Sequence, residues 1–180
     1  MDVGFTEACF RKIQNELIFL SKTWSDIKLI LITHAHSDHI DNLKKVFNAA
    51  GNPEVMLGEL DVEALKSQTG IETDMILDGG DVIDACGGIE VISVPGHSPG
   101  NLCFYIREEK LIIAGDTIMV DEYGALTPPP NRYCDDPELA KQSVKKILDY
   151  DFDKLLLSHG EPIVIEAKKS VEALVKRLML

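Results

Sequence analysis

Histidines and an aspartate crowd one short stretch of this sequence. The run "THAHSDH" at positions 33–39 contains three of the five histidines in the 180-residue chain. Crowded imidazoles disfavour each other's protonation, and a shared cation removes this difficulty because it binds their lone pairs. The stretch therefore indicates a metal site, to which it offers the side chains of His34, His36, Asp38 and His39.

Three further polar residues each follow an apolar stretch of the chain. His97 comes after "VISVPG", Asp116 after "LIIAG" and His159 after "KLLLS". Taken singly, each is well explained by the chemistry of a turn. Together with the histidine cluster, they put nitrogen and oxygen donors at the ends of four expected strands, which is where open α/β sheets build their sites.

The number and kind of these donors predict the metal content. Seven candidate ligands exceed the four that tetrahedral zinc takes, so we expect two divalent metal ions. The set contains no thiolate, which suits zinc first, then iron or manganese, in a catalytic rather than a structural site. Two such ions would lower the pKa of a bridging water. Asp38 is the candidate catalytic residue, since it could orient that water or accept its proton.

These residues need strands and helices to position them. A helix-like apolar period over 7–21 precedes the continuous apolar run 27–32, which is typical of a buried strand. Further helices are expected over 39–50, 60–68, 137–148 and 165–177, and further strands over 54–58, 74–77, 81–85, 88–94, 101–109, 110–115 and 154–158. This mixture predicts a layered α/β or α+β domain.

Composition narrows the class of protein. A 180-residue chain that is 45% apolar predicts one globular domain over residues 1–180. The net charge of −12 argues against a nucleic-acid partner, and no apolar stretch approaches membrane-spanning length. Four scattered cysteines and the lack of a signal-peptide pattern suit the cytoplasm. The expected partner is a small-molecule substrate.

At this point the motifs resemble a known family. "HAHSDH" is similar to the His-x-His-x-Asp-His signature of the metallo-β-lactamase-fold hydrolases, and "PGHSPGN", "AGDT" and "SHGEP" follow in that family's order. The resemblance implies a four-layer αβ/βα sandwich with the site at one edge of its two sheets. It implies a first metal bound by His34, His36 and His97, a second bound by Asp38, His39 and His159, and Asp116 as the bridge. Zinc β-lactamases commonly carry a cysteine at the position of Asp116, so this chain resembles the glyoxalase II and lactonase branches instead.

Two departures from the family pattern carry expectations of their own. "MDVG" resembles an acidic turn that family members reach after two or more strands, so we expect an N-terminally shortened fold. Such a fold leaves a sheet edge uncovered, which predicts a homodimer; a start codon set too late is the other explanation. After Pro162 there is room for one helix only, whereas glyoxalase II carries a helical region that helps to bind glutathione. A glutathione thioester is therefore not the expected substrate.

The expected function is that of a metal-dependent hydrolase in which a metal-bridging hydroxide cleaves an ester, thioester or lactone-like bond. One alternative is a persulfide-dioxygenase-like oxidoreductase with a single iron, which would leave Asp38, His39 and His159 idle. Another is a non-catalytic metal-binding domain of the same fold. The proline-rich segment 122–136 is either a substrate contact, through Tyr123, Arg132 and Tyr133, or a rigid connector.

Overall fold

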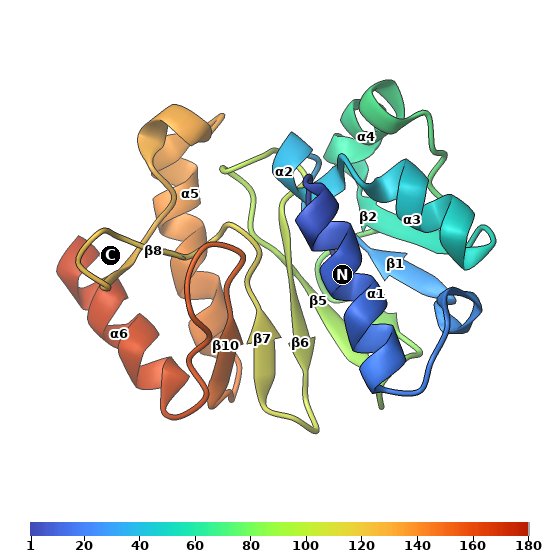
Figure 1. Cartoon of the computed structure of the whole chain (residues 1–180). Helices are drawn as coiled ribbons and strands as arrows, with labels where there is room; N and C mark the ends of the chain where they lie inside the picture. Colours follow the sequence, from blue (N-terminus) through green and yellow to red (C-terminus); the bar gives the residue numbers. More distant parts are fainter. Residues whose placement is uncertain (180) are drawn as a thin grey trace. The chain divides into compact units, whose positions relative to one another are not determined.

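The computed structural model describes residues 1–179 and divides into two compact units, Met1–Leu77 (unit 1) and the part from Asp78 onward (unit 2). Each unit contains one main sheet, its own helices and its own apolar core (Figure 1). This mixture of helices and sheets confirms the predicted α/β class. The prediction that residues 1–180 behave as a single domain stays a prediction.

Unit 1 is built around a three-stranded parallel sheet. Its strands are β1 (Leu29–Leu31), β2 (Glu54–Gly58) and β3 (Met75–Leu77), in the order β1-β2-β3. Its helical elements are α1 (Glu7–Phe19), η1 (Trp24–Asp26), α2 (Ser37–Ile40), α3 (Leu43–Ala50), η2 (Glu59–Asp61) and α4 (Val62–Thr69). The buried side chains of Ile32, Leu57 and Leu65 belong to one core cluster. β1 and β2 are buried on both faces, which explains why they read as continuous apolar runs, whereas Met75 and Ile76 of β3 are exposed.

The single helix predicted over 39–50 is wrong, because the structure has two helices there. α2 ends at Ile40 and α3 begins at Leu43. Between them the side-chain amide of Asn42 donates to the carbonyl groups of Val3 and Thr6, at 3.2 and 2.9 Å. These bonds attach the N-terminal segment to the break. Tertiary contacts of this kind override the local apolar period.

Unit 2 is built around a five-stranded mixed sheet with the order β10-β7-β6-β5-β4. The strands are β4 (Val82–Ile83), β5 (Ile89–Ser93), β6 (Leu102–Ile106), β7 (Leu111–Ile113) and β10 (Lys154–Leu156). β6 is antiparallel to both β5 and β7, and β10 is parallel to β7. β5, β7 and β10 therefore run in the same direction, and their carboxyl ends lie at the same edge of this sheet.

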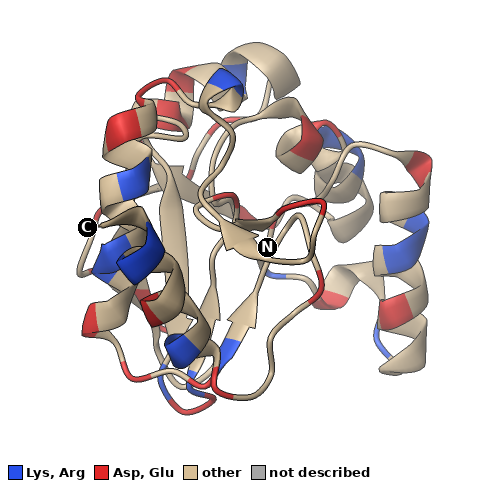
Figure 2. Ribbon diagram, turned by 90° about the vertical axis from the view of Figure 1, so that its left-hand side faces the viewer, with Lys and Arg blue, Asp and Glu red and all other residues tan. Residues whose placement is uncertain are grey.

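The helices of unit 2 complete its core. α5 (Pro137–Ser143) continues as the 3₁₀ helix η4 (Val144–Asp149), so only the first half of the helix predicted over 137–148 is an α-helix. α6 (Ala167–Leu178) buries Val171 and Leu174 in the core and carries several Lys and Arg residues (Figure 2). No helix within residues 1–179 is both long and apolar enough to cross a membrane.

A small hairpin in unit 2 has no counterpart among the expected elements. β8 (Met119–Val120) pairs with β9 (Leu126–Thr127) in the antiparallel sense. The Asp121 carboxylate closes the turn by accepting from the backbone N–H groups of Tyr123 and Ala125, at 2.9 and 2.8 Å. Two-residue strands are too short to produce a recognisable alternation of apolar and polar residues.

Candidate metal centre

The loop that carries His34 and His36 follows β1 in unit 1. Hydrogen bonds to side chains of η2 and α4 hold its backbone in place. The N–H of Ala35 donates to Asp61 Oδ2, and its carbonyl accepts from Gln68 Nε2, both at 3.0 Å. Both polar groups of this buried residue are thereby satisfied. The pinned backbone places the rings of His34 and His36 with their centroids 4.7 Å apart. Each ring offers a nitrogen within 4.8 Å of the other.

One carboxylate organises the rest of this loop. Asp2 Oδ1 accepts from the Thr33 N–H, and Asp2 Oδ2 accepts from both Thr33 Oγ1 and His39 Nδ1, each at 2.8 Å. Because an ionised carboxylate can only accept, Nδ1 of His39 carries the hydrogen. In the neutral ring the lone pair then lies on Nε2, which is 3.6 Å from Asp38 Oδ2. Carboxylate–histidine pairs of this kind fix the tautomer and the orientation of metal-binding imidazoles.

The same carboxylate sets the tautomer of His34 through Thr33. The only hydroxyl hydrogen of Thr33 is donated to Asp2, so its Oγ1 must accept from His34 Nδ1 at 3.0 Å. The lone pair of neutral His34 is therefore also on Nε2. Thr33 and His34 are fully buried, which strengthens these bonds by excluding water. Unit 1 thus contains two imidazoles whose Nε2 atoms carry the lone pair, and a neutral imidazole binds a metal ion through such a nitrogen.

In unit 2 the three candidates come from strands that end at one edge of the sheet. Asp116 follows β7, His97 follows β5 and His159 follows β10. Asp116 Oδ2 lies 3.3 Å from His97 Nε2 and 3.5 Å from His159 Nε2. His97 and Asp116 are buried, whereas the side chain of His159 is 47% exposed. One carboxylate oxygen beside two imidazoles is an arrangement that suits a bridging ligand.

Thr117, the residue after Asp116, belongs to a buried network of polar side chains. Thr117 Oγ1 accepts from Asn101 Nδ2 at 3.0 Å and from the thiol of Cys103 at 3.2 Å. Asn101 Nδ2 also donates to the Val94 carbonyl at 3.1 Å. Burial raises the pKa of the Cys103 thiol to about 12, so this thiol stays protonated and keeps its role as a donor. The network ties the residue after Asp116 to β6 and to the end of β5.

The loop that carries His97 packs closely against the start of α5. The backbone N–H groups of Asp135 and Asp136 donate to the carbonyl groups of His97 and Gly96, at 3.3 and 2.9 Å. Gly96 has a φ of +126°, and a Cβ atom there would lie 2.2 Å from the Ala140 nitrogen. Only glycine fits at this close approach.

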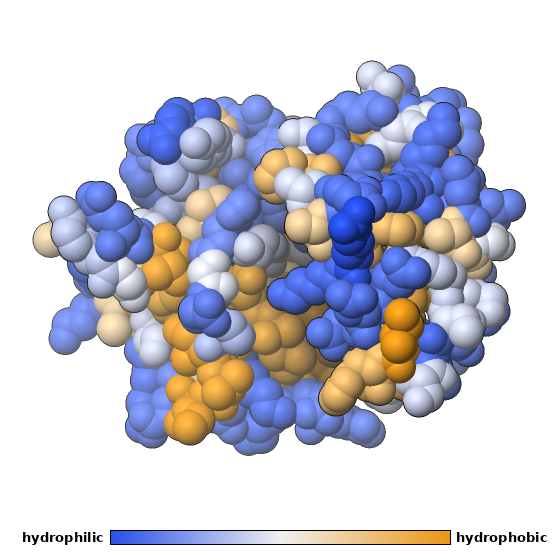
Figure 3. Space-filling view, in the orientation of Figure 1, coloured by the Kyte–Doolittle hydropathy of each residue, from blue (hydrophilic) through white to orange (hydrophobic). Residues whose placement is uncertain are grey.

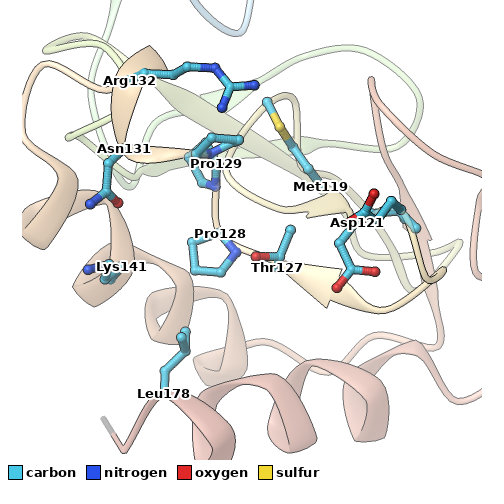
Figure 4. Close-up of a pocket in the computed structure, with 12 residues that line it drawn as sticks. Met119, Asp121, Thr127, Pro128, Pro129, Asn131, Arg132, Lys141 and Leu178 are labelled. Carbon is cyan, nitrogen blue, oxygen red and sulfur yellow. The ribbon is translucent and has the colours of Figure 1, made fainter.

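The segment 122–136 has a defined place in unit 2. Arg132 stacks on Tyr133, with its guanidinium carbon 4.5 Å from the ring centroid. Arg132 also lines an open groove of about 540 Å³ together with Met119, Pro129 and Lys141 (Figure 4). Tyr123 lies in the turn of the β8–β9 hairpin and is 86% exposed. The segment is therefore both a connector and part of a groove wall.

His34, His36, Asp38 and His39 lie close together as one group in unit 1, and His97, Asp116 and His159 lie close together as a second group in unit 2. Their assignment to particular metal ions stays a prediction. Residues that the sequence reasoning assigned no role support both groups, namely Asp2, Thr33, Asp61, Gln68, Asn101 and Thr117. Their bonds join residues far apart in the chain, such as Asp2 and Thr33, which are 31 positions apart. No local pattern marks such partners.

The donor chemistry of both groups fits divalent cations. Each group combines imidazole nitrogens with carboxylate oxygens, and neither includes a cysteine among the described residues. In unit 1 hydrogen bonds set the tautomers, and in unit 2 one carboxylate lies beside two rings. Such nitrogen and oxygen donors suit zinc, iron and manganese.

Solved structures of low sequence identity share the fold. A metallo-β-lactamase family protein of Thermus thermophilus, TTHA1429, has a TM-score of 0.76 and 20% identity, covering 99% of this chain and 69% of that chain. TTHA1623, solved in a di-iron-bound form, has a TM-score of 0.70 and 21% identity, covering 88% of this chain and 81% of that chain.

Curated proteins match a shorter part of the chain. A hydroxyacylglutathione hydrolase of Francisella tularensis subsp. holarctica is 29% identical over 101 residues, which is 56% of this chain and 37% of that protein. The uncharacterised protein YobT of Bacillus subtilis is 29% identical over 110 residues, 51% of this chain and 46% of that protein. The matches therefore span less than half of these relatives. The family model of the metallo-β-lactamase superfamily matches residues 2–159, and the chain belongs to that superfamily.

Proposed function

We propose that this protein is a metal-dependent hydrolase that cleaves an ester, thioester or lactone-like bond. The observation that carries the proposal is the Asp2 carboxylate, which directs the lone pairs of two buried imidazoles to their Nε2 atoms. Both rings then carry an unprotonated Nε2, the form in which an imidazole nitrogen binds a metal ion. Membership of a superfamily of metallo-hydrolases supports the same conclusion.

The proposed ligands are those of the sequence analysis. We assign one divalent ion to His34, His36 and His97, and a second to Asp38, His39 and His159, with Asp116 as the bridge. Support comes from the donor groups of each unit and from the family to which the chain belongs. Zinc is the proposed metal, with iron or manganese as substitutes; the di-iron form of TTHA1623 supports iron as a metal of this fold.

Divalent ions at such a site lower the pKa of water and polarise a carbonyl group. The chain's own residues provide the geometry and the proton transfers. Asp38, with a side chain that is 35% exposed, can orient the attacking water and accept its proton. Asp2 and Thr33 keep His39 and His34 from changing tautomer. The exposed side of His159 leaves room for a substrate to approach.

The proposal includes the binding partner of the protein and its cellular location. The partner is a small-molecule substrate rather than nucleic acid or membrane, since a net charge of −12 repels phosphate backbones. All four cysteines are free thiols, which suits the reducing cytoplasm.

A substrate screen tests the proposal. Metal-loaded protein is offered p-nitrophenyl esters, acyl thioesters, lactones and a phosphodiester, with the His36→Ala variant as the control. We expect hydrolysis of at least one acyl substrate by the wild type and loss of that activity in the variant. Absence of acyl hydrolysis would contradict the proposal. One iron per chain together with oxygen consumption on a persulfide would favour the oxidoreductase alternative.

A further inference from the structure

A second groove of unit 2 is apolar and lies against α6. It has a volume of about 560 Å³ and runs between the β8–β9 hairpin, the loop after β10 and α6. Its lining is mainly aliphatic and includes Val120, Leu126, Pro162, Ile163, Ala173 and Leu174. A concave, mostly apolar site of this size is typical of small-molecule binding. We refer to it as the apolar groove.

Exposed apolar side chains directly adjoin the lining residues along the chain. Val164 and Ile165 directly follow Ile163 of the lining and are 58% and 76% exposed, and Tyr123 precedes the lining residue Gly124. Figure 3 shows orange apolar side chains in the part of unit 2 where α6 and the loop after β10 lie in Figure 1. Soluble proteins rarely leave contiguous apolar surface in water unless it binds something.

The apolar groove adjoins a proposed metal ligand. The Val120 N–H, from the wall of the groove, donates to the His159 carbonyl at 3.1 Å. The next residue, Gly160, has a φ of +147°, and a Cβ atom there would lie 2.4 Å from Val120 Cγ2. The groove wall and the loop of His159 are thus packed together within unit 2. The lining takes up the chain again at Glu161, so the groove begins two residues after this ligand.

Charge at the groove indicates a neutral occupant. Among the described residues its lining includes only two charged side chains, Glu161 and Arg177. Arg177 Nη2 donates to the Leu126 carbonyl, so one of the donors of this guanidinium is directed at the hairpin. An anionic ligand would also face the carboxylate of Glu161. The lining therefore favours an alkyl chain over a charged group.

We propose that the apolar groove binds the acyl chain of the substrate, so that the enzyme prefers medium-chain acyl esters or thioesters to acetyl ones. This inference rests on the proposed hydrolase function. Hydrolysis breaks the bond between the acyl carbon and its ester oxygen or thioester sulfur. The oxygen of water bonds to the acyl carbon, and a proton from that water passes to the leaving alcohol or thiol.

Direct binding is the first part of the test. The uncharged dye N-phenyl-1-naphthylamine is bound to metal-loaded protein and displaced by octanol, and its fluorescence reports the affinity. Ala173 is an exposed residue of the lining, so Ala173→Trp fills the groove without disturbing the core. We expect octanol affinity to fall by about tenfold or more in this variant. Glu172→Trp is the matched control, since Glu172 is exposed on the same helix and outside the lining, and it should bind octanol as the wild type does.

Kinetics with acyl chains of increasing length form the second part. Across p-nitrophenyl acetate, butyrate, hexanoate and octanoate, kcat/KM of the wild type should rise by roughly fourfold per added methylene while the groove fills. In Ala173→Trp this rise with chain length should disappear. In Glu172→Trp the rise should remain.

The outcomes separate the two proposals. Ester cleavage with no dependence on chain length, or with the same dependence in Ala173→Trp, overturns the role of the groove and leaves the hydrolase function standing. Absence of cleavage for these esters and for the thioesters and lactones of the substrate screen overturns the hydrolase function and, with it, the groove as a substrate site, even if octanol binds. Light scattering that shows a wild-type dimer and an Ala173→Trp monomer would mean that a second copy covers the groove, which also overturns the inference.

Discussion

Asp2 accepts a hydrogen bond from Nδ1 of His39 at 2.8 Å, across 37 positions of sequence. The same carboxylate oxygen accepts from Thr33, which in turn accepts from His34. One acidic side chain near the start of the chain therefore controls which nitrogen carries the lone pair in two candidate ligands.

The Asp2→Asn variant tests this control. An amide has one acceptor oxygen where the carboxylate has two, so at least one of the three bonds to Asp2 is lost. We expect metal affinity to fall by about 10- to 100-fold, as for other partners of ligand histidines. Zinc titration against a competing chelator measures the affinity. Asp41→Asn, an exposed position next to α2, is the control and should bind zinc as the wild type does.

Metal content is the second prediction. Seven nitrogen and oxygen donors exceed the four that one tetrahedral ion takes, so we expect about two divalent ions per chain, and chelation should abolish hydrolysis. Elemental analysis of metal-loaded protein gives the stoichiometry. Finding no bound transition metal would contradict the assignment of all seven ligands.

Substitutions of ligands should be far more damaging than a change in the proline-rich segment 122–136. His34→Ala, His36→Ala and Asp116→Ala should each lower kcat/KM by roughly two orders of magnitude or more, because the metals provide the chemistry. Tyr133→Phe removes one hydroxyl from a half-exposed ring and should cost less than about tenfold. Equal losses in all four variants would show that the division of roles is wrong.

Gly96→Ala should destabilise unit 2. The added Cβ would meet the backbone of Ala140 in α5, and alanine is strained at a φ of +126°. Together these effects should lower the free energy of unfolding by about 3 kcal/mol. Gly80→Ala separates the backbone strain from the steric clash, because Gly80 also has a positive φ but open space around it. This variant should lower the free energy of unfolding by roughly 1–2 kcal/mol. Urea unfolding of the two variants gives the comparison, and equal losses would contradict the close packing at Gly96.

We also predict a homodimer. β1 is an edge strand that pairs with β2 on one side only, and an edge strand can pair with a second copy of the chain. A closed two-fold assembly is the simplest arrangement that covers such an edge. Light scattering at micromolar concentration measures the mass in solution, and a monomer would rule the dimer out.

The main strands and the candidate ligands could be predicted from the sequence, because each ligand directly follows a local apolar run. The apolar runs before His97, Asp116 and His159 are β5, β7 and β10, and their common direction explains why the polar residues after them meet at one edge. The break between α2 and α3 could not be predicted, since it depends on Asn42 bonding to residues almost forty positions earlier.

The supporting residues of the site were missed for the same reason. An aspartate at position 61 resembles any other acidic residue at the start of a helix until its bond to the Ala35 N–H is known. The β8–β9 hairpin escaped because two-residue strands leave no period to detect. Hydrogen bonds between residues far apart in the chain therefore could not be predicted from the sequence.

The buried thiol behind Asp116 has a consequence for oxidative stress. Oxidants and alkylating reagents attack the thiolate of cysteine, and the pKa of Cys103, about 12, keeps its thiolate population negligible at neutral pH. Cys103 is also fully buried, so such reagents cannot reach its sulfur in the folded protein. The sulfur that supports Thr117 is thus chemically inert, and the network beside the proposed bridging ligand should persist when the exposed thiol of Cys86 is oxidised.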